Sequence, residues 1–307
     1  MSSTSQIPRP NTDLVVGPVV GLSIDAEEAL RQLSALQTRD AKLPRPAADF
    51  LLIRDHPAGG NGEDVQAQLV ASFAAGRLDG IGIVPEIDVF RGDPYLVARA
   101  IASLDILSKG RAGFIPLTAP VDLLDIGYAR TASDAEYVAE FVAVVDSLWN
   151  NWQPGALARD WKNNRYIDRN RIREANHEGP YFLVKGPLPT PTAVQDTPPV
   201  IARRHPAHAG IADRASALIH DGAATAGQGE SPALLEILLD SPSLPDSFAA
   251  HMGVVLRAEG GFADWAELVD RTHRAHARLD LKWRPSDGTL ADILARPATS
   301  ISEISHV

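Results

Sequence analysis

The chain has 307 residues and a formal net charge of −10, so it lacks the clustered lysine and arginine that a nucleic-acid binder needs. It contains no cysteine, which excludes disulfides, thiolate metal sites and cysteine nucleophiles. No apolar run approaches the ~20 residues of a membrane span, and the first ten residues lack the apolar centre of a secretory signal, so we expect a cytoplasmic protein.

Short apolar runs alternate along the chain with longer amphipathic segments. The runs predict strands at Asp13–Val20, Ala48–Arg54, Gly80–Val84, Ala112–Leu117, Pro199–Ala202, Ala217–His220 and Leu234–Leu239. The longer segments predict helices at Asp25–Thr38, Glu63–Ala75, Pro94–Ser108, Ser133–Trp152, Ala207–Arg214, Pro245–Glu259 and Ala263–Leu279. This rhythm favours a parallel sheet with crossover helices. A length above ~250 residues, and a first turn that reads GLSID rather than G-x-G-x-x-G, favour a (β/α)8 TIM barrel over a doubly wound sheet.

The block Asp93–Phe114, DPYLVARAIASLDILSKGRAGF, contains the clearest single element. Asp93 can cap the first amides, Pro94 suits the first helical turn, and Lys109-Gly110 suits the end of a helix. Apolar residues recur at helical spacing, which predicts one face against the core at Leu96, Val97, Ile101, Leu104 and Leu107.

One long polar segment, about 153–198, interrupts the rhythm and contains the β-like piece Tyr181–Val184. An excursion of this length is typical of a lid or an oligomer contact. The last repeats are short, because the eighth strand is reduced to Gly260–Phe262. We expect residues 1–307 to form one barrel domain, with this insertion after the fourth βα unit and a tail from about 284 that holds a helical turn at Thr289–Ala295.

Two stretches carry a resemblance to a known family. The segment PYLVARAIASLDILSKGRAGF is similar to PYHLAR-x-x-ASLD-x-LS-x-GRAGWN of the bacterial luciferase-like flavin monooxygenases, in their nitrilotriacetate and dibenzothiophene-sulfone monooxygenase branch. The insertion resembles the family's own, with His177-Glu178-Gly179 and Gly186-Pro187 at its marker positions. On this pattern His177-Glu178 is a structural corner rather than an acid/base pair, and Trp149, Trp152 and Trp161 anchor the insertion to the barrel.

This resemblance implies a (β/α)8 barrel that assembles as a homodimer or tetramer. It implies FMN as cofactor, delivered in reduced form by a separate flavin reductase, and oxygenation of a small organic substrate. A deazaflavin-dependent reductase on the same fold remains open. The family is not metal-dependent, so a metal site at His205, His208 and His220 is not expected.

The family's flavin contacts lie at the ends of strands, and this chain departs from them. Glu86 and Asp88 follow the third strand, where two carboxylates would repel a flavin phosphate and suit a cationic substrate, a metal or simple exposure better. Thr118 alone keeps a polar contact after the fourth strand. Tyr128 is close enough in sequence to replace a family tyrosine.

After the fifth strand the chain reads Arg203-Arg204-His205, where the family has small residues that hold phosphate. These three residues form either a rewired phosphate cradle or a solvated basic turn. Asp55-His56 at the end of the second strand is either a substrate contact or an ordinary turn.

Two functions follow from these residues. The first is an FMN-dependent monooxygenase in which Thr118, Arg203, Arg204 and His205 bind the flavin phosphate. In that enzyme Glu86 contacts the ring or substrate, and Asp55, His56 and Tyr128 act in catalysis. The second is a catalytically degenerate paralogue that serves as a binding or subunit-partner protein.

Overall fold

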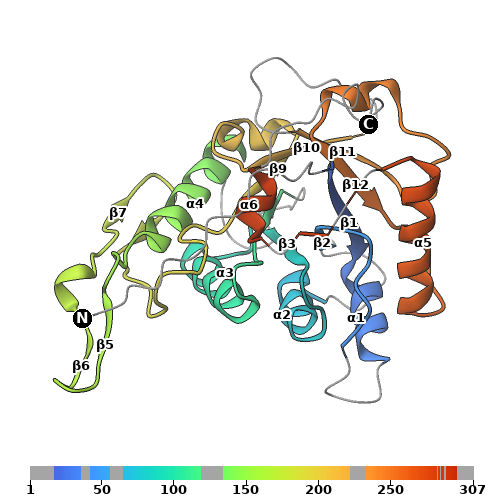
Figure 1. The fold of residues 1–307 in the computed structure, drawn as a ribbon. Helices are drawn as coiled ribbons and strands as arrows, with labels where there is room; N and C mark the ends of the chain where they lie inside the picture. The colour runs from blue at the N-terminus through green and yellow to red at the C-terminus, as the bar shows by residue number, and fades with distance from the viewer. Residues whose placement is uncertain are drawn as a thin grey trace.

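The computed structural model describes residues 17–35, 42–55, 65–118, 134–221, 233–281, 283, 285–286 and 288–295. Eight parallel strands run around a barrel in chain order (Figure 1): β1 Val19–Asp25, β2 Phe50–Arg54, β3 Gly82–Asp88, β4 Ile115–Leu117, β9 Ile201–Arg203, β10 Ala217–Asp221, β11 Ala233–Leu238 and β12 Gly253–Arg257. The edge strands β4 and β9 meet at a parallel bridge between Phe114 and Val200, where Ile201 N donates to Phe114 O at 3.0 Å. The predicted barrel is therefore confirmed.

Full helices follow the first four strands and the last one. They are α1 Ala26–Ser34, α2 Ala67–Arg77, α3 Pro94–Ser108, α4 Asp134–Trp149 and α5 Trp265–Arg278. Short 3-10 segments, η3 Pro206–Ile211 and η4 Asp246–Ala250, follow β9 and β11 instead. The units that begin with β9 and β11 are thus shortened at their helices, where the sequence predicted the helices Ala207–Arg214 and Pro245–Glu259.

The helix α3 has the bounds and caps that its sequence predicts. Asp93 Oδ1 accepts hydrogen bonds from the amides of Tyr95 and Leu96 at 2.9 and 3.1 Å, and Lys109 ends the helix at φ 60°. The predicted apolar face is only partly right, because Leu96 and Leu107 are 59% and 76% exposed. The buried residues of α3 include Val97, Ile101 and Leu104, and α2 and α4 both pack against this helix.

Two expectations about the strands are wrong. The first strand begins at Val19, so it overlaps the predicted Asp13–Val20 only at its end. The predicted helix Pro245–Glu259 contains η4 and the eighth strand, which is Gly253–Arg257 rather than Gly260–Phe262. A short apolar run is compatible with a helix or with a strand. Here the run forms a strand because it pairs with β1 and β11. At Gly253 a Cβ atom would collide with the backbone of Val19.

The helix α6 (Leu290–Leu294) closes the end of the barrel at which the strands begin. Figure 1 shows it in front of the strands. Its residues Leu290, Ile293 and Leu294 pack with apolar side chains from the barrel interior. Thr289 and Asp292 form a capping box at its start. The predicted helical turn at Thr289–Ala295 is confirmed.

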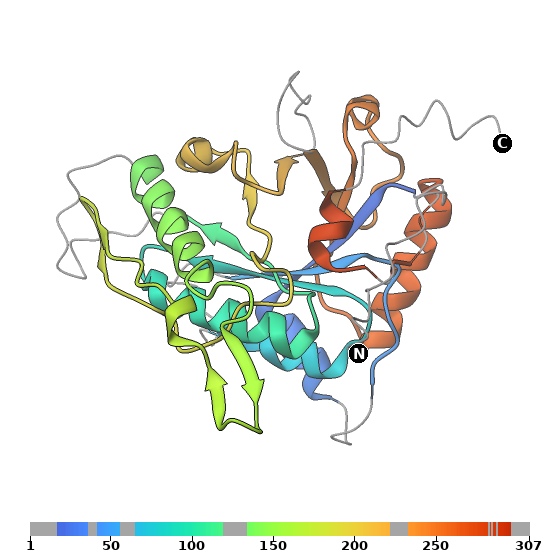
Figure 2. The same cartoon turned by 60° about the vertical axis from the view of Figure 1, so that its left-hand side comes forward.

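The insertion forms two small hairpins, β5 Leu157–Asp160 with β6 Arg165–Ile167, and β7 His177–Glu178 with β8 Leu183–Val184. Glu140 on α4 accepts from His177 Nε2 at 2.9 Å and from the amide of Phe182 at 3.0 Å, which supports the structural corner. The indoles of Trp149 and Trp152 each donate to a backbone carbonyl at 2.9 Å. Trp161 is 79% exposed on the hairpin that projects from the barrel (Figure 2), so it does not anchor the insertion to the barrel.

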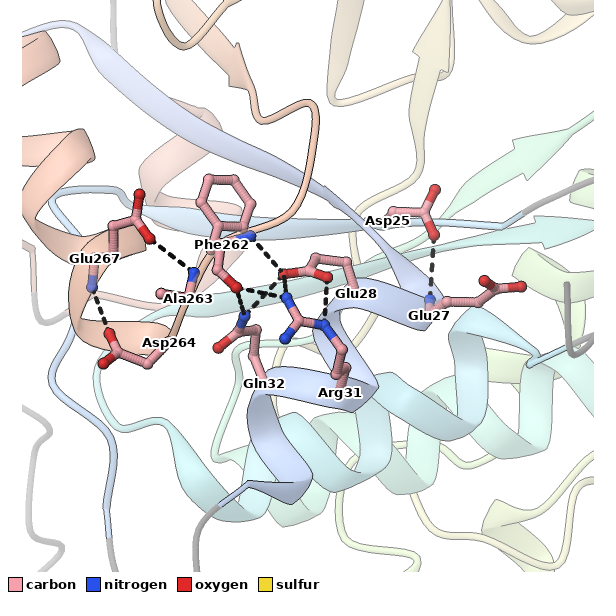
Figure 3. A network of polar contacts seen from close by, with 9 residues as sticks. All are labelled: Asp25, Glu27, Glu28, Arg31, Gln32, Phe262, Ala263, Asp264 and Glu267. Carbon is pink, nitrogen blue, oxygen red and sulfur yellow. Dashed lines mark hydrogen bonds and ion pairs between the residues drawn. The ribbon is translucent and has the colours of Figure 1, made fainter.

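A polar network joins the first and last helical units of the barrel (Figure 3). Arg31 Nη2 donates to the Phe262 carbonyl at 2.6 Å, and Glu28 Oε1 accepts from the Phe262 amide at 3.3 Å. Asp264 then caps α5 by accepting from the amide of Glu267 at 2.9 Å. The network therefore fixes the entry of α5 beside α1.

Asp105 on α3 connects three distant segments. It is fully buried, and its carboxylate accepts from the amide of Gln195 at 3.1 Å, from Gln195 Nε2, and from the amide of Ala112 at 3.3 Å. Gln195 in turn accepts from the amide of Ala291 at 2.7 Å. The end of the insertion, the entry to β4 and α6 are thereby held together.

Replacing Asp105 with alanine should lower the free energy of unfolding by about 2–4 kcal/mol, because several buried donors lose their acceptor. Chemical denaturation at neutral pH measures the change. Asp79→Ala is the control, since Asp79 pairs with Lys42 in solvent and its loss should cost under about 1 kcal/mol. Equal effects of the two substitutions would show that the Asp105 contacts do not hold these segments.

Candidate functional site

Charged side chains gather inside the barrel at the carboxyl ends of its strands. Strand side chains alternate, so residues two positions apart share a face. Five interior apolar residues mark that face: Leu52, Val84, Ile201, Leu234 and Val255. Two positions further along the same strands, and so also facing inward, are Arg54, Glu86, Arg203, Glu236 and Arg257. The interior is therefore apolar toward the start of the strands, and it carries charged side chains at their carboxyl ends, which we call the mouth of the barrel.

Arg203 links two glutamates across this mouth. Its Nε and Nη2 donate to Glu86 Oε1 at 3.0 and 2.7 Å, and its Nη1 donates to Glu236 Oε2 at 2.9 Å. In the closed ring, β3 and β11 lie opposite each other and β9 lies midway between them. We call Glu86, Arg203 and Glu236 the crossbar, because they span the barrel.

Burial and charge pairing shift the pKa values of Glu86 and Arg203. It raises the pKa of the Glu86 carboxyl above its ordinary value, although Arg203 acts in the opposite direction. Burial alone would lower the pKa of Arg203, but the two carboxylates outweigh it and raise that pKa, so the guanidinium stays charged. In the described part of the chain, Glu236 Oε1 is buried and receives no hydrogen bond.

His208 fixes the end of β9 that carries Arg203. Its Nδ1 accepts from the amide of Arg203 at 2.9 Å, and the ring is buried. Burial lowers the pKa of His208 to about 4, so the imidazole is neutral at pH 7 and can act as this acceptor.

A cavity of about 390 Å³ lies beside Glu86, at the ends of β2 and β3 and the starts of α1, α2 and α3. Its walls carry five carboxylates and one guanidinium, from Glu27, Asp55, Glu86, Asp88, Asp93 and Arg91. A second hollow of about 450 Å³ includes Glu236, Asp221 and Arg257. The two glutamates of the crossbar therefore line different cavities.

The structure brings together some of the predicted site residues. Glu86 and Arg203 are in direct contact, and Asp55 lines the same cavity as Glu86. Thr118 is half-buried just after β4, and Arg204 and His205 are exposed after β9. His56 and Tyr128 fall outside the described residues.

Sequence reasoning missed Glu236, Arg54 and Arg257. Glu236 had a detectable signal, because it is a lone charge within the apolar strand ALLEIL. Among the described residues, no group of histidine, aspartate and glutamate is arranged to hold a metal ion, and no helix is long and apolar enough to span a membrane.

Several curated proteins with similar sequences are monooxygenases. The chain is 31% identical over 126 residues to N-acetyl-S-(2-succino)cysteine monooxygenase of Bacillus subtilis (strain 168), which covers 39% of this chain and 29% of that protein. It is 31% identical over 159 residues to nitrilotriacetate monooxygenase component A of Aminobacter aminovorans, and this alignment covers 49% of the chain and 35% of that protein. The chain is homologous to the luciferase-like monooxygenases. The aligned regions span only about a third of these two relatives.

A longer alignment joins the chain to one subunit of the pristinamycin IIA synthase of Streptomyces pristinaespiralis, at 29% identity over 230 residues, 74% of this chain and 77% of the relative. Among solved structures, a long-chain alkane monooxygenase superposes with a TM-score of 0.57 at 18% identity, covering 67% of this chain and 57% of the enzyme. This likeness supports the luciferase-like barrel fold. No protein-family model matches the chain.

Replacing Arg203 with leucine should cost about 3–5 kcal/mol at pH 7, because it leaves two buried carboxylates unpaired. The deficit should shrink as the pH falls, because burial raises the pKa of the Glu86 carboxyl and this carboxyl then becomes neutral by protonation. Urea unfolding at pH 7 and pH 5 measures both effects. Arg204→Leu, at the exposed neighbour, should change stability by less than about 0.5 kcal/mol. A pH-independent loss would contradict the role of charge.

The low pKa of His208 predicts a loss of stability in acid. The unfolded imidazole takes up a proton below about pH 6.5, whereas the folded one does so only near pH 4, so stability falls as the pH drops through this window. Between pH 7 and 5 the loss should reach about 2 kcal/mol. The substitution His208→Asn keeps an acceptor for the Arg203 amide but introduces a side chain that cannot titrate. Unfolding curves of this variant should lack that part of the acid loss.

Proposed function

We propose that this chain is a flavin-dependent monooxygenase that acts on a small organic molecule. The observation that carries this proposal is its 31% identity to two monooxygenases, on a barrel whose carboxyl end gathers polar side chains. The flavin would arrive reduced from a separate reductase. One relative is called component A, a name that agrees with an enzyme of more than one component.

The residues at the mouth fit the phosphate of FMN. Arg204 and His205 are exposed after β9, and Thr118 offers a hydroxyl after β4. A guanidinium, an imidazole and a hydroxyl are suitable donors for a phosphate. The guanidinium of Arg203 already holds two glutamates, so we assign it to positioning the crossbar and assign the phosphate to the other three residues. When bound, FMN would supply the redox chemistry that activates dioxygen.

Glu86 and Asp55 face the cavity of about 390 Å³, which is large enough for a small substrate. We propose this cavity as the substrate pocket. In it the crossbar would keep Glu86 in one position, while Asp55 is held by the amide of Ala67 at 3.4 Å. The cytoplasmic location and a homodimer or tetramer stay predictions.

Binding of reduced FMN under anaerobic conditions tests the proposal. Arg204→Ala and His205→Ala should each weaken binding by about tenfold. His205→Ala should also lower the melting temperature slightly, because His205 Nδ1 accepts from the amide of Ala207 at the start of η3. Fluorescence titration measures the affinity.

Arg159→Ala is the matched control, since Arg159 is an exposed arginine on the projecting hairpin and should not affect binding. If wild-type protein shows no saturable binding at high micromolar flavin, the monooxygenase proposal is wrong and the degenerate paralogue takes its place.

A further inference from the structure

The hairpin formed by β5 and β6 is a strongly basic part of an acidic chain. We call residues 157–173, which include both strands and the 3-10 segment η2 (Arg169–Arg171), the basic hairpin. Its six basic residues and two aspartates give it a net charge of +4, so the rest of the chain carries −14 within the total of −10. Glu174, the next residue, lies 3.5 Å from Lys185 and does not balance this charge. The net charge of the whole chain therefore does not reveal this local cluster.

Most of the basic side chains in the hairpin have no acidic partner. Arg171 lies 3.5 Å from Asp168, and Arg165 is opposite Asp160 in the strand register. The others are exposed and form no ion pair with a described residue: Arg159, Lys162, Arg169 and Arg173. An acidic surface that contacts the hairpin would supply the partners that these side chains lack.

Aromatic and apolar side chains are exposed between these charges. Trp161 is 79% exposed, Tyr166 49% and Ile167 38%. The rings of Trp161 and Tyr166 lie 5.4 Å apart, so they form one aromatic patch. Tryptophan, tyrosine and arginine are the residue types that dominate binding energy at protein–protein interfaces. The basic hairpin therefore has the composition of a protein contact surface.

The base of the hairpin is attached to the preceding loop, and its tip projects from the barrel. Arg171 Nη1 donates to the Pro154 carbonyl at 2.9 Å, and the amide of Asp168 donates to the Ala156 carbonyl at 2.8 Å. Beyond this base the two strands pack mainly on each other (Figure 2). A two-stranded hairpin without further packing is only marginally stable in water. A partner that covers its exposed side chains would stabilise it.

We propose that the basic hairpin docks on the acidic surface of a second copy of this chain. Charge complementarity supports this partner, because the rest of that copy carries −14. Direct pairing of two hairpins would instead bring like charges together. In a two-fold dimer each copy offers its hairpin to the other, so the contact forms twice. The seventeen residues of the hairpin, with the surface that receives the other hairpin, reach the about 20–30 residues per partner of a standard interface.

Sedimentation velocity of the full chain tests the contact. In about 50 mM NaCl the protein should form a dimer at micromolar concentration. Raising NaCl to about 500 mM should increase the dissociation constant at least tenfold, because salt screens the charges that join the two copies. A chain that stays monomeric in low salt, or a dimer that salt does not weaken, would overturn the proposal.

Three substitutions locate the contact. Arg169→Glu reverses a hairpin charge and Trp161→Ala removes the most exposed ring, so each should weaken the dimer at least tenfold. Arg99→Glu is the matched charge reversal at an exposed arginine of α3, and it should change the dissociation constant by less than about threefold. Circular dichroism confirms that all three variants fold. A dimer that is lost in Arg99→Glu but kept in both hairpin variants would contradict the proposal.

A single-stranded nucleic acid is the competing occupant, because basic side chains with exposed rings also suit its backbone and bases. The −14 carried by the rest of the chain disfavours it by repulsion. Fluorescence anisotropy with a labelled oligonucleotide separates the two. Saturable micromolar binding to the oligonucleotide would overturn the choice of partner, and its absence would sustain it. None of these measurements involves flavin, so this inference and the proposed function fail separately.

Discussion

The ion pairs of Arg203 are the constraint on which the mouth of the barrel depends. The guanidinium of Arg203 is half-buried, and it pairs with two glutamates on opposite strands. Because β9 lies between them, the side chain crosses the interior and fixes the positions of Glu86 and Glu236 together. Both cavities that these glutamates line therefore share one arginine.

Below this ionic layer the barrel is held by ordinary packing and by a few long-range contacts. Apolar strand residues fill the interior and α6 closes its lower end. The buried carboxylate of Asp105 holds Gln195, which in turn holds α6, so the insertion and the barrel floor are tied to α3. A rigid floor of this kind lets the strand ends above it carry charged groups in defined positions.

The parts of the fold that local chemistry determines could be predicted from the sequence. The bounds of α3 follow from Asp93, Pro94 and Lys109, all within the helix or next to it. The strand β12 was mistaken for a helix because its five residues fit either state, and only its partners β1 and β11 decide. Local pattern cannot contain that information.

The same limit applies to the candidate site. Glu86 and Arg203 could each be named from their positions at strand ends, but they are 117 residues apart, and nothing local indicates that they form an ion pair. An arginine after a strand suggested a phosphate ligand, whereas the barrel turns its guanidinium inward to two carboxylates. Pairing across a closed barrel is a property of its strand order, which a motif does not encode.

Stability alone does not explain why the mouth is ionic. The layer beneath it shows that leucine, isoleucine and valine can fill this barrel. Well-packed apolar residues usually stabilise a protein at least as well as a buried ion pair does, because they avoid the cost of desolvating charges. The crossbar carries that cost and still leaves Glu236 Oε1 buried without a hydrogen-bond donor among the described residues. The charged residues at this end of the barrel therefore cost stability that an apolar layer would not cost.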